Sequence, residues 1–180
     1  MFDKTEATEF LRGMRQARQY TTDPVSDDDL RAILAVAQWT GSAMNQQPWE
    51  FVVLQDRSRI AALGAIDRYI SFCGGAPLVI LPVMYGSAIA EHAFDEGRLV
   101  ERIMLAAAAR GLGAGVGWLH GEAVAGVGEM IAMPAGRVVR SIVAIGRPAV
   151  VEGSGSRPAQ PRRPLSELVH YESFAAPSAD

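Results

Sequence analysis

Three arginines near the start of the chain are spaced so that they could bind one anion. Arg12, Arg15 and Arg18 recur at every third position, and on a helix that spacing confines them to about a third of the circumference. Guanidinium groups bind phosphate through paired, charge-assisted hydrogen bonds. A second basic group lies near the other end of the chain: Arg157, Arg162 and Arg163. The pattern favours a phosphate held from both ends of the chain, and a solvated basic stripe is the simpler alternative for the first cluster.

Uncharged polar side chains are concentrated in residues 40–49, which include Ser42, Asn45, Gln46 and Gln47. The helical spacing of apolar residues in 30–39 and the buried-strand pattern of 51–54 make this segment a helix-to-strand connection. Connections of this kind often carry binding residues. The hydrogen-bonding side chains suit a polar heterocycle.

A glycine run at 111–117 invites comparison with the dinucleotide-binding fingerprint. That fingerprint needs a preceding strand, a following helix and glycine at its sixth position. Here an alanine-rich helix precedes the run and Val116 takes the sixth position. A helix C-cap explains Gly111, and the other glycines would let backbone N–H groups approach a flat ligand closely.

Other common chemistries have little support in the sequence. His92, His120 and His170 are far apart and show no metal-ligand spacing, so no metal site is expected. Ser42 lacks the G-x-S-x-G context of a hydrolase nucleophile, and Cys73 has no adjacent base.

The composition is that of an ordinary globular domain. The 180 residues are 49% hydrophobic and 21% charged with a net charge of −3, which argues against disorder and nucleic-acid binding. A single cysteine and an amino terminus unlike a signal peptide make the cytoplasm the expected location. Residues 71–90 carry no charge, but glycines and prolines interrupt them, so no membrane crossing is expected.

The patterning predicts a mixture of helices and strands. Helices are expected at about 3–14, 26–39, 57–65, 87–110, 122–131 and 164–169, and strands at 51–54, 78–81, 118–119 and 138–145. Pro82 should end its strand or place it near a sheet edge. The 87–110 helix becomes apolar on every face toward its end, so it should be central or at a subunit interface. We expect one domain over 1–174 with a flexible connector at 150–161, and a disordered tail at 175–180.

The chain resembles the FMN-dependent nitroreductase family in eight short pieces that follow one another over nearly its whole length. They are RQARQY (15–20), PV (24–25), GSAMNQQPW (41–49), AP (76–77), DEG (95–97), GLG (111–113), IGRP (145–148) and RRPL (162–165). The resemblance implies an α+β fold with a central, mostly antiparallel sheet flanked by helices. It also implies a homodimer with two FMN sites at the subunit interface.

Carried over by position, the resemblance implies a set of cofactor-binding residues: Arg15, Gln16, Arg18, Ser42, Asn45, Gln47, Gly117, Trp118, Arg162 and Arg163. Arg15 and Arg162 would bind the FMN phosphate, with Gln16 and Arg163 as neighbours. Asn45 would bind the pyrimidine edge or the ribityl chain, Ser42 would come from the segment that crosses the interface, and N–H groups near Gly117 and Trp118 would meet the ring nitrogen that exchanges hydride.

Arg18 is the residue expected to contribute to catalysis. It would face the pyrimidine edge of the flavin, where a fixed cation stabilises the negative charge of the reduced ring and raises the reduction potential. The implied reaction is a ping-pong transfer of hydride from NADH or NADPH to FMN and then to a nitroaromatic, quinone-like or other small electron-poor acceptor.

Two alternatives keep the flavin and change its use. One is a different flavin reaction, such as oxygen-dependent flavin fragmentation or reductive dehalogenation. The other is a flavin-binding module without turnover, in which Met14, Gln16 and Met44 replace residues that the family usually has.

Overall fold

The computed structural model describes residues 3–85, 89–149 and 161–174. The chain divides into two compact units, 1–149 and 150–180. The expected connector at 150–161 lies almost wholly outside the described residues, and the expected tail at 175–180 lies outside them entirely.

Within the described residues, one sheet forms the centre of the first unit, and every pairing in it is antiparallel. Its strands are β1 (Trp49–Leu54), β2 (Leu78–Tyr85), β3 (Gly113–Trp118), β4 (Arg137–Val139) and β5 (Ser141–Gly146). The order across the sheet is β1-β2-β5-β3, and β4 also pairs with β2. The expected antiparallel sheet is therefore present.

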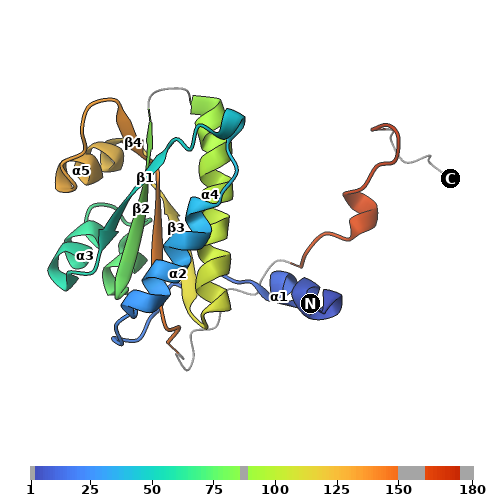
Figure 1. The fold of residues 1–180 in the computed structure, drawn as a ribbon, viewed down its shortest axis with the longest axis horizontal. Helices are drawn as coiled ribbons and strands as arrows, with labels where there is room; N and C mark the ends of the chain where they lie inside the picture. Colours follow the sequence, from blue (N-terminus) through green and yellow to red (C-terminus); the bar gives the residue numbers. More distant parts are fainter. Residues whose placement is uncertain (1–2, 86–88, 150–160, 175–180) are drawn as a thin grey trace. The chain divides into compact units, whose positions relative to one another are not determined.

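Helices cover both faces of this sheet (Figure 1). The covering helices are α2 (Asp27–Gln38), α3 (Arg57–Gly64), α4 (Ile89–Ala109) and α5 (Glu122–Met130). The first helix, α1 (Lys4–Gly13), has no buried residue. Short 3₁₀ turns lie at Ala43–Asn45, Ser71–Gly75 and, in the second unit, Leu165–Glu167. Alternate strand residues face opposite layers. Ile80 and Val143 belong to the core under α2 and α4, while Leu81 and Ile142 belong to the core under α3 and α5.

The strand that contains Pro82 does not end there. β2 continues to Tyr85 and lies inside the sheet, so the expectation of a strand end or a sheet edge is wrong. On the side away from β1, β2 pairs with β5 through Leu78–Ile80 and with β4 through Val83–Tyr85. Pro82 falls between these two pairings, where its missing N–H interrupts neither of them.

The last two strands come from a segment expected to form one. Arg140 separates β4 from β5, which begins at Ser141. β4 pairs with the far end of β2, and β5 pairs with β2 and β3.

The strand expected at 118–119 is longer and begins earlier, at Gly113. The glycines that read as a turn in the sequence form a strand because they pair with β5.

The first helix ends before two of the three arginines that were expected to share its surface. α1 ends at Gly13, and Met14 has extended backbone angles. Arg15 and Arg18 therefore lie in an extended segment and not on the helix that carries Arg12.

No helix among the residues described is both long and apolar enough to span a bilayer.

Candidate functional site

The extended segment 14–20 lies along the outer edge of β3. The Ala17 N–H donates to the Ala114 carbonyl at 2.8 Å, and the Val116 N–H donates to Gln16 Oε1 at 3.3 Å. The Tyr20 hydroxyl donates to the Ala17 carbonyl. Edge strands expose unpaired backbone groups, and here the chain's own amino-terminal segment uses part of that edge.

Glycines in β3 make this close approach possible. A Cβ at Gly113 would come within 2.6 Å of Ala17 Cβ, and a Cβ at Gly115 would meet the Ala17 carbonyl oxygen. A Cβ at Gly117 would come within 2.8 Å of the Ile70 side chain. The expectation that a flat ligand lies over these glycines is wrong for this face, because the chain's own residues fill the space.

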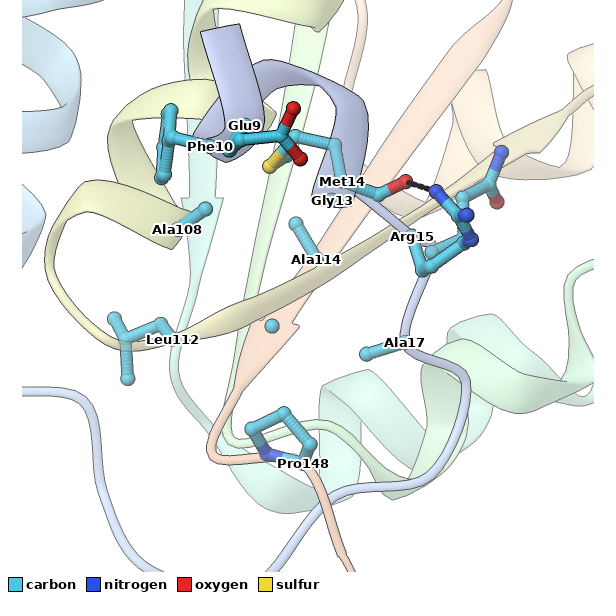
Figure 2. Close-up of a pocket in the computed structure, with 12 residues that line it drawn as sticks. Glu9, Phe10, Gly13, Met14, Arg15, Ala17, Ala108, Leu112, Ala114 and Pro148 are labelled. Carbon is cyan, nitrogen blue, oxygen red and sulfur yellow. Dashed lines mark hydrogen bonds between the residues drawn. The ribbon is translucent and has the colours of Figure 1, made fainter. Parts of the chain in front are cut away.

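Arg15 and Arg18 are both exposed beside the outer edge of β3. Arg15 Nη1 donates to the carbonyls of Arg12 and Met14 at 2.9 and 2.7 Å, and Figure 2 shows the second of these bonds. The Arg18 guanidinium lies 5.4 Å from the centre of the Phe72 ring, within the range of a cation–π contact. Among the described residues neither arginine has an ion pair with a carboxylate, whereas Arg12 is paired with Glu9.

A pocket of about 520 Å³ opens between α1, the end of α4 and β3. Its lining includes the polar side chains of Arg15 and Gln16 and the apolar side chains of Phe10 and Leu112. Pockets of this volume are common for small ligands and cofactors. The predicted phosphate-binding residues Arg15 and Gln16 thus share one cavity with an apolar wall.

The end of β3 presents one backbone donor away from the sheet. Gly117 is in register with Ile142, and the Leu119 N–H donates to the Arg140 carbonyl at 2.7 Å. Backbone groups alternate in direction along a strand, so the Trp118 N–H points to the same outer side as the Val116 N–H. Of the two predicted donors, Trp118 faces the open edge and Gly117 faces β5.

The polar loop between α2 and β1 has an unusual backbone. Met44, Asn45 and Gln47 have φ values of 48°, 55° and 50°, in the left-handed region that costs a non-glycine residue about 1 kcal/mol or more. The Gln47 N–H donates to Ser42 Oγ at 2.8 Å, which holds the turn together. Asn45 is exposed, and the Met44 side chain is 87% exposed. Such strain is concentrated at functional sites.

Two residues of α4 fix this loop, and sequence reasoning assigned them no role. The buried Asp95 carboxylate accepts a hydrogen bond from the Ala43 N–H at 3.2 Å. The Arg98 guanidinium packs over Gly41, where a Cβ would come within 2.7 Å of Nη2. Asp95 lies in the DEG piece (95–97) of the family resemblance. This piece was the sequence signal that could have identified Asp95 as part of the site.

The predicted site residues fall into three separate groups. Arg15, Gln16 and Arg18 lie in the segment along the β3 edge, and Arg15 and Gln16 share a pocket with Ala108 at the end of α4. The polar loop is attached at Asp95, about 20 Å away along the α4 axis at 1.5 Å per residue. The third group is in the second unit: Arg162, which is exposed, and Arg163, whose Nε is 3.2 Å from a Glu167 carboxylate oxygen.

Two titratable groups beneath β3 are held in their neutral forms. Burial, together with the nearby Cys73, raises the pKa of Tyr20. Burial raises the pKa of the Cys73 thiol to about 12. Cys73 is therefore protonated at neutral pH and unsuited to act as a nucleophile, in agreement with the sequence reasoning. Among the described residues no cluster of His, Cys, Asp and Glu could hold a metal ion.

Comparison with known proteins identifies the class to which this fold and site belong. A family model described as the nitroreductase family matches residues 11–70. A protein from Desulfovibrio desulfuricans, described as a candidate nitroreductase and solved in complex with FMN, is 31% identical with a TM-score of 0.77, and the match covers 97% of this chain and 100% of that chain.

Two further relatives agree. A protein from Clostridium acetobutylicum, described as a candidate NADH oxidase, is 28% identical with a TM-score of 0.79, over 92% of this chain and 99% of that chain. A protein from Archaeoglobus fulgidus, named as a candidate NADH dehydrogenase/NAD(P)H nitroreductase, is 29% identical over 152 residues, which are 79% of this chain and 86% of the relative. The chain belongs to the nitroreductase family, as the sequence resemblance predicted.

Proposed function

We propose that the protein is an FMN-dependent oxidoreductase that takes hydride from NADH or NADPH and delivers it to a small electron-poor acceptor. The observation that carries this proposal is the pair of exposed arginines at the β3 edge, Arg15 and Arg18, which have no carboxylate partner among the described residues. In a nitroreductase fold, two uncompensated cations beside an open pocket suit a phosphorylated cofactor that becomes more negative when reduced.

The donor groups at this edge fit FMN. Arg15 would bind the phosphate, with Gln16 beside it. Gln16 accepts the Val116 N–H through its oxygen, which leaves its amide N–H groups free to donate to the phosphate. When bound, FMN would supply the hydride-exchanging ring.

The chain's own residues would tune and orient that ring. Arg18 would place its positive charge at the pyrimidine edge, where it stabilises the reduced form and raises the reduction potential. The Arg18 guanidinium lies over the Phe72 ring at cation–π distance. The outward N–H of Trp118 would donate to the nitrogen that exchanges hydride, and Gly117 would contribute through the backbone that precedes it.

Two chains would contribute to each flavin site. Ser42, Asn45 and Gln47 are attached about 20 Å along α4 from the pocket at Arg15 and Gln16. A homodimer would bring the polar loop of one chain to the β3 edge of its partner, with Asn45 on the pyrimidine edge or ribityl chain. The exposed Trp39 and Met44 next to this loop are suited to a subunit contact.

FMN uptake by the flavin-free chain tests the proposal. We expect the protein to bind FMN and quench its fluorescence. Loss of a charge-assisted phosphate contact in Arg15→Ala should weaken binding by roughly 10- to 100-fold. Arg12→Ala is the matched control, because Arg12 is already paired with Glu9 on α1. A chain that takes up no FMN, or equal weakening by both substitutions, would contradict the proposal.

A further inference from the structure

A buried ion pair joins α4 to the sheet beside the end of β3. The Glu96 side chain is 1% exposed, and its carboxylate accepts hydrogen bonds from Arg140 Nε at 2.9 Å and from Ser141 Oγ at 2.6 Å. The Arg140 side chain is 14% exposed. Burying two charges is costly, and apolar residues of similar size are often at least as stabilising. The pair therefore calls for an explanation other than stability.

Of the two residues that Glu96 binds, Arg140 holds the chain at the end of β3, and Ser141 lies beside that end. The Arg140 carbonyl accepts the Leu119 N–H at 2.7 Å, and Ser141 lies opposite Trp118 in the pairing register. Arg140 also occupies the break between β4 and β5. Glu96 therefore holds the Arg140 side chain directly. It also holds Ser141, the residue that follows Arg140.

This arrangement determines the direction of one backbone donor. Gly117 is tied to β5 by its register with Ile142, and Leu119 is tied to Arg140. The peptide group that joins Gly117 to Trp118 carries the Gly117 carbonyl on the β5 side, so its N–H, that of Trp118, points away from the sheet. A rotation at Arg140 would break its hydrogen bond with Leu119. The Trp118 N–H would then no longer be held in one direction.

We propose that Glu96 is a positioning residue that aims the Trp118 N–H at the flavin, acting through Arg140 and Ser141. This inference rests on the proposed FMN-dependent function and adds to it a residue on α4 that does not itself touch the cofactor. A small misplacement of a group at a reacting atom can slow a reaction by up to about 100-fold without disturbing binding. Glu96 should therefore affect the rate of hydride transfer more than cofactor affinity.

Two substitutions, one milder than the other, test the positioning role of Glu96. Ser141→Ala removes one hydrogen bond to Glu96 and keeps the ion pair, so it should fold normally. Glu96→Gln keeps the shape of the side chain and removes its charge. The matched control is Glu50→Gln, because Glu50 pairs with Arg137 of β4 at 3.0 Å but is 55% exposed and lies away from β3.

Hydrogen exchange in the flavin-free protein gives a readout that does not depend on activity. In Ser141→Ala and Glu96→Gln, exchange of the Leu119 amide should become at least roughly tenfold faster, while amides in β1 stay unchanged. In the FMN-loaded protein, the rate constant for reduction by nicotinamide should fall roughly 10- to 100-fold, with the Kd for FMN and the KM for nicotinamide changed by less than about threefold. Glu50→Gln should change none of these quantities.

Three results would overturn the proposal. Unchanged Leu119 exchange in both variants would show that Glu96 does not hold the end of β3. An unchanged reduction rate in both variants, with a wild-type protein that is reduced normally, would remove the positioning role and leave the proposed function intact. A wild-type protein that binds no FMN would defeat the proposed function itself, and with it the flavin as the target of Trp118.

Discussion

Arg18 is exposed, stacks on Phe72 and lacks a carboxylate partner among the described residues. Its positive charge is therefore not neutralised by a neighbour in the same unit, and it can act on a bound flavin. Arg18→Ala should slow flavin reduction by roughly 10- to 100-fold, because a fixed donor to developing charge is worth about that much or more. Arg18→Lys should recover part of the loss, since it keeps the charge without the planar fork.

The measurement for Arg18 is stopped-flow reduction at saturating FMN, together with the flavin reduction potential. Arg31→Ala is the control, because Arg31 is exposed on α2 and paired with Asp28. The potential should become more negative in Arg18→Ala and stay constant in Arg31→Ala. Equal rates and potentials in all of these proteins would remove the proposed role of Arg18.

Cys73 should make the fold sensitive to alkali. Burial raises its pKa from 9.0 to about 12, so the folded state disfavours the thiolate. This contribution to stability is complete below the unfolded pKa and is lost as the pH rises from about 9 toward 12. Between pH 9 and 10 the free energy of unfolding should fall by about 1 kcal/mol more in the wild type than in Cys73→Ala.

Urea unfolding of both proteins at pH 8, 9 and 10 tests this expectation. Keeping the pH at or below 10 limits the contribution of Tyr20, whose pKa is also raised by burial. If stability fell in parallel for the wild type and Cys73→Ala, the thiol would not be the titrating group.

At the scale of elements, the close contact between β3 and segment 14–20 is what places the arginines. Gly115→Ala would put a Cβ onto the Ala17 carbonyl oxygen and within 3.0 Å of Phe72. Overpacking of this kind costs typically 1–3 kcal/mol. We expect Gly115→Ala to lower the melting temperature and to weaken FMN binding, because the segment that carries Arg15 and Arg18 must shift.

Gly126→Ala on α5 is the matched control for this substitution. Its Cβ would meet nothing closer than the Ile66 side chain at 3.4 Å, and alanine is favoured over glycine in a helix by about 0.5–1 kcal/mol. It should leave stability equal or higher and FMN binding unchanged. Normal FMN binding by Gly115→Ala would show that segment 14–20 does not position the phosphate ligands.

Helices were predictable from the sequence where local signals agree with burial. The second helix was expected at about 26–39 and is observed at Asp27–Gln38, where Ser26 Oγ accepts the Asp29 N–H at 3.1 Å and caps its start. The full extent of β3 was not predictable, because glycine has a low strand propensity and only pairing with β5 recruits it. The continuation of β2 through Pro82 likewise depends on which neighbours pair with each part of the strand.

The candidate site was predictable only in part, for a similar reason. Arg15, Arg18 and Asn45 were predicted from their residue types and from the order of the motifs that the chain shares with the family. Neither signal requires knowledge of the fold. Asp95 and Glu96 were missed as supports, because acidic residues on a helix usually lie on its solvated face. Their burial follows from the packing of α4 against the sheet and the polar loop.

At the scale of the whole molecule, a shared site predicts complementation between defective chains. Arg15→Ala and Asn45→Ala homodimers should each have two damaged flavin sites. A mixed dimer would have one site with both defects and one intact site. Mixing the two variants under conditions that allow subunit exchange should therefore restore up to about a quarter of wild-type activity, since roughly half of the dimers are mixed and each has one good site.

The readout is hydride transfer from NADH or NADPH in the mixture, compared with each variant alone. Mixing Arg15→Ala with Gln16→Ala is the control, because both residues line the same pocket in one chain, so no mixed dimer of these variants has an intact site. Equal activities for both mixtures would contradict a site shared between chains.

The absorption spectrum of the purified protein under anaerobic conditions tests the central claim most directly. The account predicts a flavin spectrum that bleaches when NADH or NADPH is added without oxygen and returns when an electron-poor acceptor follows. A protein that binds no FMN, or whose bound FMN neither nicotinamide reduces, would contradict it.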